Sequence, residues 1–268
     1  MTNPSPTFQL TILGSGTSTG VPIPTCKCSV CRSKEPKNHR LRASAWLSYK
    51  GRSILIDTST DLRQQALTQK IERVDAVLYT HPHTDHIHGI DELRCFNFSQ
   101  KETIPLYGNS WTCEELRHRF GYIFDPGPVE GGGSPQLELH QFDPTAYSIR
   151  KPLRIKGVPI LPLQLQHGSR ECIGYRIESV AYVTDCSYIP EKTLDQMKGL
   201  KVLVLDCVRP APHRTHLNLD RALEVISKLK PRKTFLTHLG HEFDHKTWSK
   251  KLPKGVALAY DGLKITLN

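Results

Sequence analysis

The sequence predicts a layered α/β fold, in which β-sheets pack together and helices cover the outside. Strand-like runs rich in Val, Ile, Leu and Tyr recur along the whole chain and are bounded by Gly, Pro or charged residues. Helical patterns lie between some of these runs. Mixed elements of this kind are typical of sheets with helices on their outer faces. No internal repeat or firm boundary interrupts the 268 residues, so residues 1–268 are expected to form a single domain.

Each predicted strand is a short apolar run that ends at a turn-forming or charged residue. In chain order the predicted strands cover residues 8–13, 44–49, 53–57, 76–80, 160–166, 174–178, 181–184, 202–206, 234–237 and 255–259. Helices are predicted over residues 61–69, 111–120 and 219–230. The last helix has Asn218 as its expected N-cap, and its apolar face would hold Leu219, Leu223, Ile226 and Leu229. The glycine-rich stretch 127–135 is expected to be an exposed loop.

The composition is that of an ordinary globular protein, with 38% hydrophobic and 23% charged residues. The polar opening residues carry no secretory signal, and no run approaches the roughly 20 apolar residues of a membrane helix. A cytoplasmic location without a membrane partner is therefore expected, and in that compartment clustered cysteines favour metal binding over disulfides. The net charge of +10 favours an anionic partner such as a phosphate ester or nucleic acid, although scattered Lys and Arg residues on solvated faces would also explain it.

The strongest chemical signal is the segment His81-Pro-His83-Thr-Asp85-His86, which directly follows an apolar run. On an irregular loop at a strand end, residues two apart can point the same way. His81 and His83 could then hold one metal while Asp85 and His86 face another. Neutral imidazole and carboxylate groups suit Zn²⁺, Mn²⁺ or Fe²⁺. The segment therefore predicts a metal site.

This segment resembles the defining motif of the metallo-β-lactamase superfamily, and the resemblance extends over most of the chain. It implies an αββα sandwich with two catalytic metals, Mn²⁺ or Zn²⁺, at the edge between two sheets. It also assigns His167, Asp185 and His238, each at the end of a predicted strand, as further ligands. One metal would take His81, His83 and His167. The second would take Asp85, His86 and His238, with Asp185 bridging the two.

Asp57, at the end of another predicted strand, matches a residue that supports the ligands from behind in that superfamily. Such a residue would orient a ligating histidine through a hydrogen bond. A carboxylate that only caps the loop is the alternative.

A second candidate site is the run Cys26-Lys-Cys28-Ser-Val-Cys31, with three thiolates in six residues. Soft sulfur ligands favour Zn²⁺ in a closed tetrahedral site, which needs a fourth ligand. His39, His241 or a distant cysteine could supply it. The remaining cysteines are expected to be buried thiols without a chemical role.

Together with residues 17–22 and 88–94, the cysteine run resembles the branch that contains the phosphoribosyl cyclic phosphate phosphodiesterase. In that branch a structural zinc takes the three cysteines and a histidine three residues after the last catalytic histidine. The resemblance therefore implies His241 as the fourth ligand and ties the N-terminal loop to the loop that carries His238. A homodimer is implied by the family alone.

The predicted reaction is hydrolysis of small phosphodiesters, cyclic ribose phosphates or nucleotide phosphodiesters among them. Two metals can hold a bridging hydroxide that attacks phosphorus in line, although the same pair could also serve acyl hydrolysis. His216, just before the helix at 219–230, matches a histidine that related phosphodiesterases place beside the phosphate. It would stabilise charge on the phosphoryl oxygens or protonate the departing alkoxide. His216 and Asp85 are the predicted catalytic residues, whereas the nearby His213 is expected to lie on the surface.

Other functions remain open at this point. A ribonuclease Z-like nuclease shares the first motif and His216, but that family carries a basic, glycine-rich arm, and the glycine cluster at 131–133 is short. A thioester hydrolase uses the same metal chemistry. A catalytically silent RNA- or metal-binding protein is the alternative from another class, and the complete set of candidate ligands argues against it.

Overall fold

The computed structural model describes residues 7–125 and 133–267, and within them the chain forms two seven-stranded sheets. The first sheet has the order β14-β1-β2-β3-β4-β5-β6. Its strands are β1 (Phe8–Gly14), β2 (Ser44–Tyr49), β3 (Arg52–Ile56), β4 (Ala76–Leu78), β5 (Ile104–Gly108), β6 (Leu137–Gln141) and β14 (Lys264–Thr266).

The second sheet has the order β13-β12-β11-β10-β9-β8-β7. Its strands are β7 (Leu153–Ile155), β8 (Val158–His167), β9 (Arg170–Ile177), β10 (Val180–Val183), β11 (Val202–Asp206), β12 (Lys233–Thr237) and β13 (Val256–Leu258). Strands β10 to β13 are parallel to one another, as are β3 to β6 in the first sheet. The carboxyl ends of neighbouring parallel strands therefore meet at one edge of each sheet.

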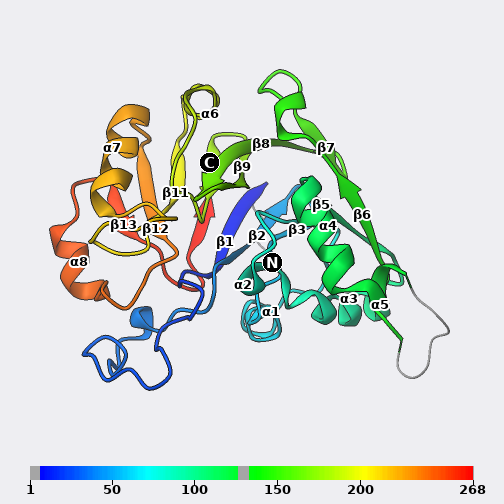
Figure 1. Cartoon of the computed structure of the whole chain (residues 1–268), viewed down its shortest axis with the longest axis horizontal. Helices are drawn as coiled ribbons and strands as arrows, with labels where there is room; N and C mark the ends of the chain where they lie inside the picture. Colours follow the sequence, from blue (N-terminus) through cyan, green and yellow to red (C-terminus); the bar gives the residue numbers. More distant parts are fainter. Residues whose placement is uncertain (1–6, 126–132, 268) are drawn as a thin grey trace, which may run out of the picture.

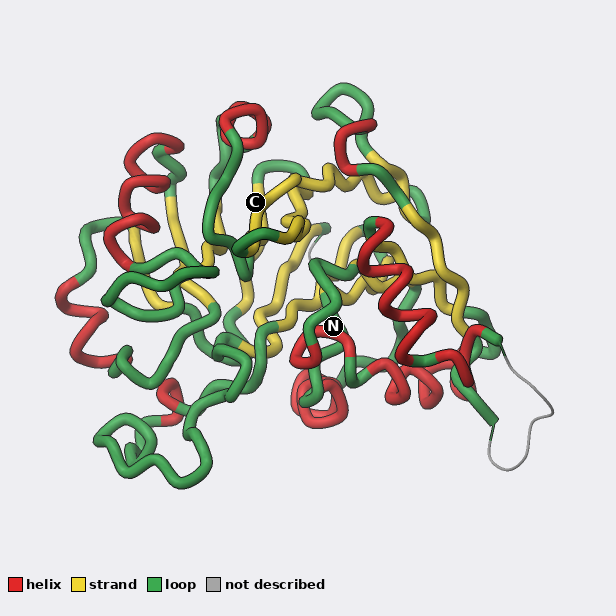
Figure 2. Tube along the Cα trace, in the orientation of Figure 1, coloured by secondary structure: helices red, strands yellow, loops and turns green. Residues whose placement is uncertain are grey.

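Helices flank both sheets on their outer faces (Figures 1 and 2). They are α1 (Leu62–Gln69), α2 (Thr84–Ile87), α3 (Leu93–Gln100), α4 (Ser110–Arg119), α5 (Gly121–Phe124), α6 (Glu191–Gln196), α7 (Leu219–Leu229) and α8 (His245–Lys251). None of the helices in the described part of the chain is long and apolar enough to cross a membrane.

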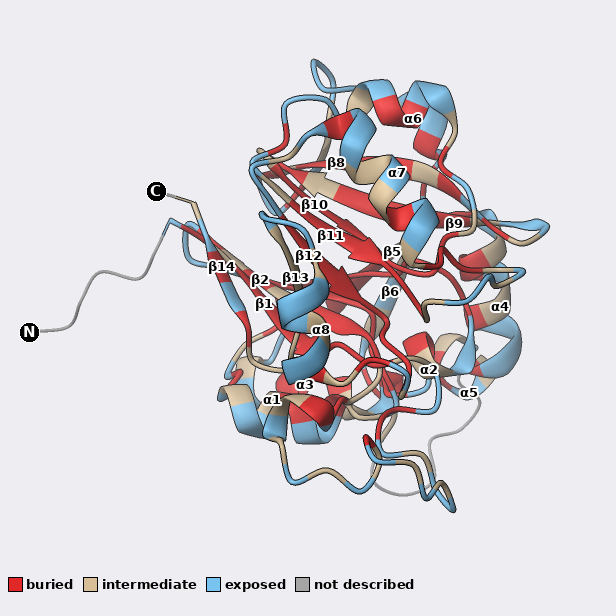
Figure 3. Cartoon of the chain, turned by 90° about the vertical axis from the view of Figure 1, so that its left-hand side faces the viewer, coloured by how far each residue is buried: buried red, intermediate tan, exposed pale blue. Residues whose placement is uncertain are grey.

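Three apolar clusters hold these layers together. Between the sheets, Leu10 and Leu47 of the first sheet share a buried cluster with Ile160 and Tyr175 of the second. A second cluster packs α6, α7 and α8 on the outer face of the second sheet, and a third packs α1, α3, α4 and α5 on the first. The central strands are buried, as Figure 3 shows, which explains their nearly continuous apolar sequences. This order of layers confirms the predicted αββα sandwich.

Several elements differ from the sequence prediction. Strands β5, β6, β7 and β14 and helices α2, α3, α5, α6 and α8 were not predicted, and most of them are short or carry polar residues at many positions. Asn218 does stand at the N-cap of α7, but its side chain donates to the carbonyl of Pro210 instead of capping the helix. The buried positions of α7 are Ala222 and Leu229, and Leu223 lies outside the cluster. The loop expected at 127–135 falls largely outside the described residues.

Candidate metal centre

Three of the candidate site residues stand where a strand ends and the backbone turns sharply. Asp57 follows β3, Asp185 follows β10 and His238 follows β12. All three have positive φ angles, of 64°, 54° and 58° respectively. Non-glycine residues rarely adopt this conformation, and it persists only where surrounding contacts enforce it. The turns bring side chains from both sheets to one edge of the sandwich.

The first group contains His81, His83 and His167, with one nitrogen from each within 4.8 Å of the others. The Nε2 atom of His81 lies 3.0 Å from Nδ1 of His83. His167 is the last residue of β8, and its Nδ1 lies 2.8 Å from the carbonyl oxygen of Thr215. That contact makes Nδ1 the donor and leaves Nε2 as the atom able to bind a metal.

All three imidazoles favour the neutral form. Burial lowers the pKa of His81 well below its usual value, and the neighbouring His86 lowers it further. Burial also lowers the pKa values of His83 and His167, although the carboxylate of Asp185 opposes this effect. Metals bind neutral imidazole, so the environment prepares this group for a cation.

The second group contains Asp85, His86, Asp185 and His238, again with donor atoms within 4.8 Å of one another. The Nε2 atom of His86 lies 3.2 Å from Oδ2 of Asp85 and 3.3 Å from Oδ2 of Asp185. The other oxygen of Asp185, Oδ1, lies 3.2 Å from Nε2 of His238 and 3.9 Å from Nε2 of His81. Asp185 thus stands between the two groups, in the position that a bridging carboxylate requires.

Burial alone would raise the pKa of Asp185, but the facing His238 and His86 outweigh it and hold the pKa well below its usual range. Burial would likewise lower the pKa of His86, yet Asp185, Asp85 and Asp57 raise it well above its usual value. Opposite charges therefore offset part of the cost of burying these carboxylates and imidazoles.

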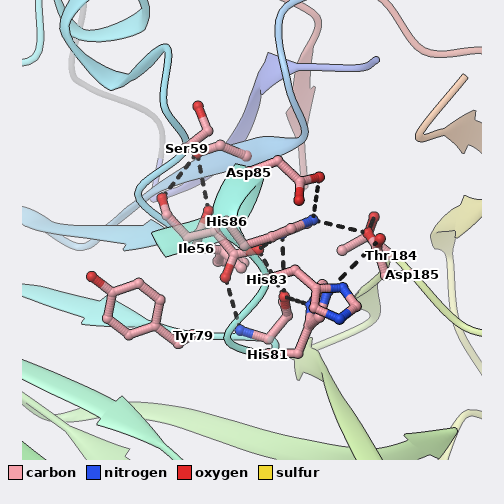
Figure 4. A network of polar contacts seen from close by, with 12 residues as sticks. Ile56, Ser59, Tyr79, His81, His83, Asp85, His86, Thr184 and Asp185 are labelled. Atoms are coloured by element: carbon pink, nitrogen blue, oxygen red, sulfur yellow. Dashed lines mark hydrogen bonds and ion pairs between the residues drawn. The ribbon is translucent and has the colours of Figure 1, made fainter. Parts of the chain in front are cut away.

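Behind the second group, Asp57 fixes the orientation of His86. The Nδ1 atom of His86 lies 2.7 Å from Oδ2 of Asp57, which leaves Nε2 facing Asp85 and Asp185. Both the amide and the hydroxyl of Thr80 donate to the same carboxylate, at 2.8 Å each. Figure 4 shows His81, His83, Asp85, His86 and Asp185 converging at this edge. Of the two roles considered for Asp57, the contacts favour support of a histidine.

His216 lies beside both groups. Its ring centroid is 4.7 Å from that of His167 and 4.7 Å from that of His238, against which it stacks. Asp206, at the end of β11, accepts a hydrogen bond from the amide of Leu217 and lies 3.4 Å from Nδ1 of His216. Burial would lower the pKa of His216, but Asp206 raises it to about 9.

The three cysteines and His241 come together at a separate place. The Nδ1 atom of His241 lies 3.3 Å from the sulfur of Cys26 and 3.6 Å from those of Cys28 and Cys31. In a tetrahedral zinc site with bond lengths of about 2.3 Å to sulfur and about 2.0 Å to nitrogen, this edge measures about 3.5 Å. The alternative ligand, His39, instead contacts the carbonyl of Ser33.

The backbone also donates hydrogen bonds to two of these sulfurs. The amide of Cys31 donates to the sulfur of Cys28, and the amide of Ile23 donates to that of Cys31. The first of these bonds lowers the pKa of Cys28 to about 7, whereas burial raises the pKa of Cys31 to about 11. Thiolate is the form that binds zinc.

The loop between β1 and β2 is held to the loop after His238 by more than the cysteines. The buried guanidinium of Arg40 donates to the carbonyls of Gly240 and Phe243. Asn38 donates to the carboxylate of Asp244. This loop, dark blue in Figure 1, therefore packs below α8 and reaches the strand end that carries His238.

The residues present fit divalent metals in all three groups. Within the described part of the chain, the buried Nε2 atoms of His86 and His238 form no hydrogen bond, although they face carboxylate oxygens at 3.2–3.3 Å. A buried nitrogen without a partner is costly, and a cation would satisfy it. The donor chemistry agrees, since imidazole and carboxylate suit Zn²⁺ or Mn²⁺, and three thiolates with one imidazole suit Zn²⁺.

Several residues of the site were not singled out from the sequence. Asp206 ends a strand parallel to those before Asp185 and His238, so strand-end position was the signal that could have revealed it. His213, which was expected on the surface, is half-buried, and its ring lies 4.9 Å from that of His216. Among the remaining cysteines, Cys113, Cys172, Cys186 and Cys207 are buried as expected, whereas Cys95 is exposed.

Comparison with known proteins supports these observations. A family model described as a β-lactamase superfamily domain matches residues 52–239. An octanoyltransferase of Porphyromonas gingivalis is 33% identical over 260 residues, which are 96% of this chain and 51% of that protein. The chain thus spans about half the length of that relative. A ribonuclease Z of Clostridium acetobutylicum is 26% identical over 55% of this chain and 47% of its own.

Among solved structures, a diphosphatase of the PhnP family is 40% identical, with a TM-score of 0.88 over 97% of each chain. Zn²⁺-bound PqqB from Methylobacterium extorquens has a TM-score of 0.76 over 97% of this chain and 100% of its own. At 19% identity the second likeness concerns the fold alone.

Proposed function

The chain belongs to the metallo-β-lactamase superfamily and to its PhnP-like branch, and we propose that this metal-dependent hydrolase cleaves small phosphodiesters. Cyclic ribose phosphates and nucleotide phosphodiesters are the proposed substrates. The observation that carries the proposal is the position of His216, between His167 and His238 and backed by Asp206.

Eleven residues are the proposed metal ligands. His81, His83 and His167 would hold one divalent ion, and Asp85, His86 and His238 a second, with Asp185 between them. Cys26, Cys28, Cys31 and His241 would hold a structural zinc. When two divalent ions are bound, they make a water molecule a nucleophile at neutral pH and offset negative charge on the reacting phosphate.

The chain's own residues supply the remaining chemistry. His216 would donate a proton to the departing alkoxide oxygen, or a hydrogen bond to a phosphoryl oxygen that gains charge. Asp206 would keep Nδ1 of His216 protonated, so that Nε2 faces the reacting group. Asp85, whose Oδ2 lies 3.2 Å from Nε2 of His86, would serve both as a ligand and as an acceptor for a water proton.

Two alternatives share the metal chemistry. A ribonuclease Z-like nuclease is supported by the relative from Clostridium acetobutylicum, which aligns with only about half of this chain. A thioester hydrolase would not need a proton donor at the position of His216, because a thiolate leaves readily. The 40%-identical neighbour is a diphosphatase, and this likeness favours chemistry at phosphorus.

Other properties belong to the same proposal. We expect zinc or manganese in the catalytic groups, a cytoplasmic location and a homodimer. The net charge of +10 would favour anionic substrates, and nucleic acid is a less favoured partner.

A panel of substrates tests the function. Protein reconstituted with Zn²⁺ or Mn²⁺ would be assayed on bis(p-nitrophenyl) phosphate, a cyclic ribose phosphate, a precursor tRNA and an acyl thioester. We expect turnover of the first two substrates and little of the others. Hydrolysis of the thioester or cleavage of the tRNA alone would contradict the proposal, and no turnover of any substrate would favour a silent binding protein.

A further inference from the structure

An aromatic ring and an uncommitted cation lie together at the rim of the first metal group. Trp111 is the second residue of α4, and its ring centroid lies 6.2 Å from that of His83, edge to face at 87°. The guanidinium carbon of Arg170 lies 5.4 Å from the centroid of the Trp111 ring. Neither side chain is used by the proposed reaction itself.

Both residues are positioned by the elements of the metal centre. Arg170 begins β9 and pairs with His167, so its side chain leaves the hairpin on the same face as that candidate ligand. The neighbouring Glu171 is bound to Asn109 and to Gln164, at 2.7 Å each. Asn109 in turn caps α4 by accepting from the amide of Thr112. These bonds lock the start of α4 to the hairpin.

The same bonds leave Arg170 without a carboxylate partner. Glu171 is occupied by two amide groups, and no acidic side chain of the described residues forms an ion pair with Arg170. Arg170 is exposed, and its only aromatic or ionic neighbour in the described ranges is the half-buried Trp111. Bases stack on aromatic side chains, and Arg adds cation–π contacts to such stacks, so an indole and an unpaired guanidinium side by side can bind a flat ring.

We propose that Trp111 and Arg170 form a subsite for the nucleobase of a nucleotide phosphodiester, with the base stacked on the indole of Trp111 and the guanidinium of Arg170 at the edge of the base. This inference rests on the proposed phosphodiesterase function and adds the residues that would recognise the base of a nucleotide substrate. His83, between Trp111 and His167, sets the distance from the base to the scissile phosphate. Trp111 and Arg170 are then specificity-determining residues.

Two p-nitrophenyl esters with the same leaving group distinguish an effect on base binding from an effect on the reaction. One is the p-nitrophenyl ester of thymidine 5′-phosphate, and the other is methyl p-nitrophenyl phosphate, which has no base. Trp111→Ala should lower kcat/KM on the thymidine ester about ten- to a hundredfold, since base stacking on an aromatic side chain is worth that much. The methyl ester should be unaffected within about twofold, and Trp111→Phe should restore part of the loss.

Arg170→Gln should lower kcat/KM on the thymidine ester by a smaller factor, and Arg63→Gln, an exposed cation on α1, serves as the matched control. Equal losses on both esters would overturn the inference, because Trp111 would then act only through His83. No loss on either ester would also overturn it. If wild-type protein hydrolyses neither ester, the proposed function fails by itself.

Binding tests the subsite without turnover. Thymidine 5′-phosphate titrated into metal-loaded protein should bind about tenfold more weakly to Trp111→Ala than to wild type. Ribose 5-phosphate should bind both alike. If Arg170→Gln weakens the binding of ribose 5-phosphate while Trp111→Ala leaves the binding of thymidine 5′-phosphate unchanged, the subsite binds a phosphate and the inference is wrong.

Discussion

The Nδ1 atom of His86 lies 2.7 Å from Oδ2 of Asp57, and both side chains are completely buried. Asp57 follows a strand of the first sheet with a φ angle of 64°, a conformation that costs free energy for any residue but glycine. The contact therefore places a buried carboxylate behind a candidate ligand. Support of this kind fixes the tautomer and the ring orientation of a histidine.

Replacement of Asp57 by Asn tests this support. The Asn variant keeps the shape but removes the charge that orients His86, so metal affinity should fall about ten- to a hundredfold. Metal content after dialysis against a buffered chelator measures the effect. Asp143→Asn, at an exposed N-cap, is the control. Undiminished metal affinity would show that Asp57 only shapes its loop.

The cysteine cluster predicts a metal that is independent of the catalytic pair. Cys28→Ser should lower the metal content by one ion per chain and lower the Tm by several degrees, because the metal held by the cysteines and His241 would join the N-terminal loop to the His238 loop. Elemental analysis and thermal unfolding measure the two effects. Cys95 is exposed, so the control variant Cys95→Ser should change neither the metal content nor the Tm. An unchanged metal content would contradict the structural zinc.

The close packing at Gly89, near the metal loop, predicts that one added methyl group lowers the stability of the protein strongly. A Cβ atom at Gly89 would lie 2.1 Å from the carbonyl oxygen of Ser59, which is backbone and cannot move aside. Gly89→Ala should therefore cost about 1–3 kcal/mol of unfolding free energy. At Gly121 a Cβ atom meets nothing within 4 Å, so Gly121→Ala is the matched control. Equal stability of the two variants in urea would contradict the packing at Gly89.

The raised pKa of Asp261 predicts that the stability of the protein depends on pH. Burial raises the pKa of Asp261 to about 6, although the amides of Leu41 and Ser15 donate to it and oppose this effect. The folded state then binds a proton at a higher pH than the unfolded state. As pH falls from about 7 towards 4, the free energy of unfolding of wild type should rise by up to about 3 kcal/mol relative to that of Asp261→Asn. Urea unfolding of both proteins at several pH values measures it, and a constant difference would contradict the raised pKa.

Much of the fold could be predicted because the central strands are apolar on both faces and end at turn residues. The predicted bounds of β2 and β11 agree with the structure at 44–49 and 202–206. Strand β6 was missed because its leucines alternate with charged and polar residues over Leu137–Gln141 and the strand lies at the edge of its sheet. Short helices such as α6 and α8 have too few apolar positions to show a period.

The candidate site was predictable where several residues fall in one segment or follow strand ends. The sequence could not reveal which strand ends meet, since that depends on the order of strands in each sheet. Asp206, Trp111 and Arg170 were missed for this reason. Each lies near the metal centre only because β9, β11 and α4 bring it there.

A proton donor must matter most for a poor leaving group. His216→Ala should lower kcat on a diester with an alkoxide leaving group more than on one that releases p-nitrophenolate, because the nitrophenolate needs no proton to depart. The ratio of the two kcat values in wild type and variant measures this. Equal losses would assign His216 to charge stabilisation on the phosphoryl oxygens.

The decisive measurement is kcat of metal-loaded His216→Ala on a cyclic ribose phosphate, with metal content determined on the same sample. We expect kcat to fall by about 10²- to 10⁴-fold while the metal content stays at the wild-type value. His118→Ala, an exposed histidine on α4, should match wild type. Unchanged kcat in the His216 variant with its metals in place would contradict the assignment of this site to phosphodiester hydrolysis.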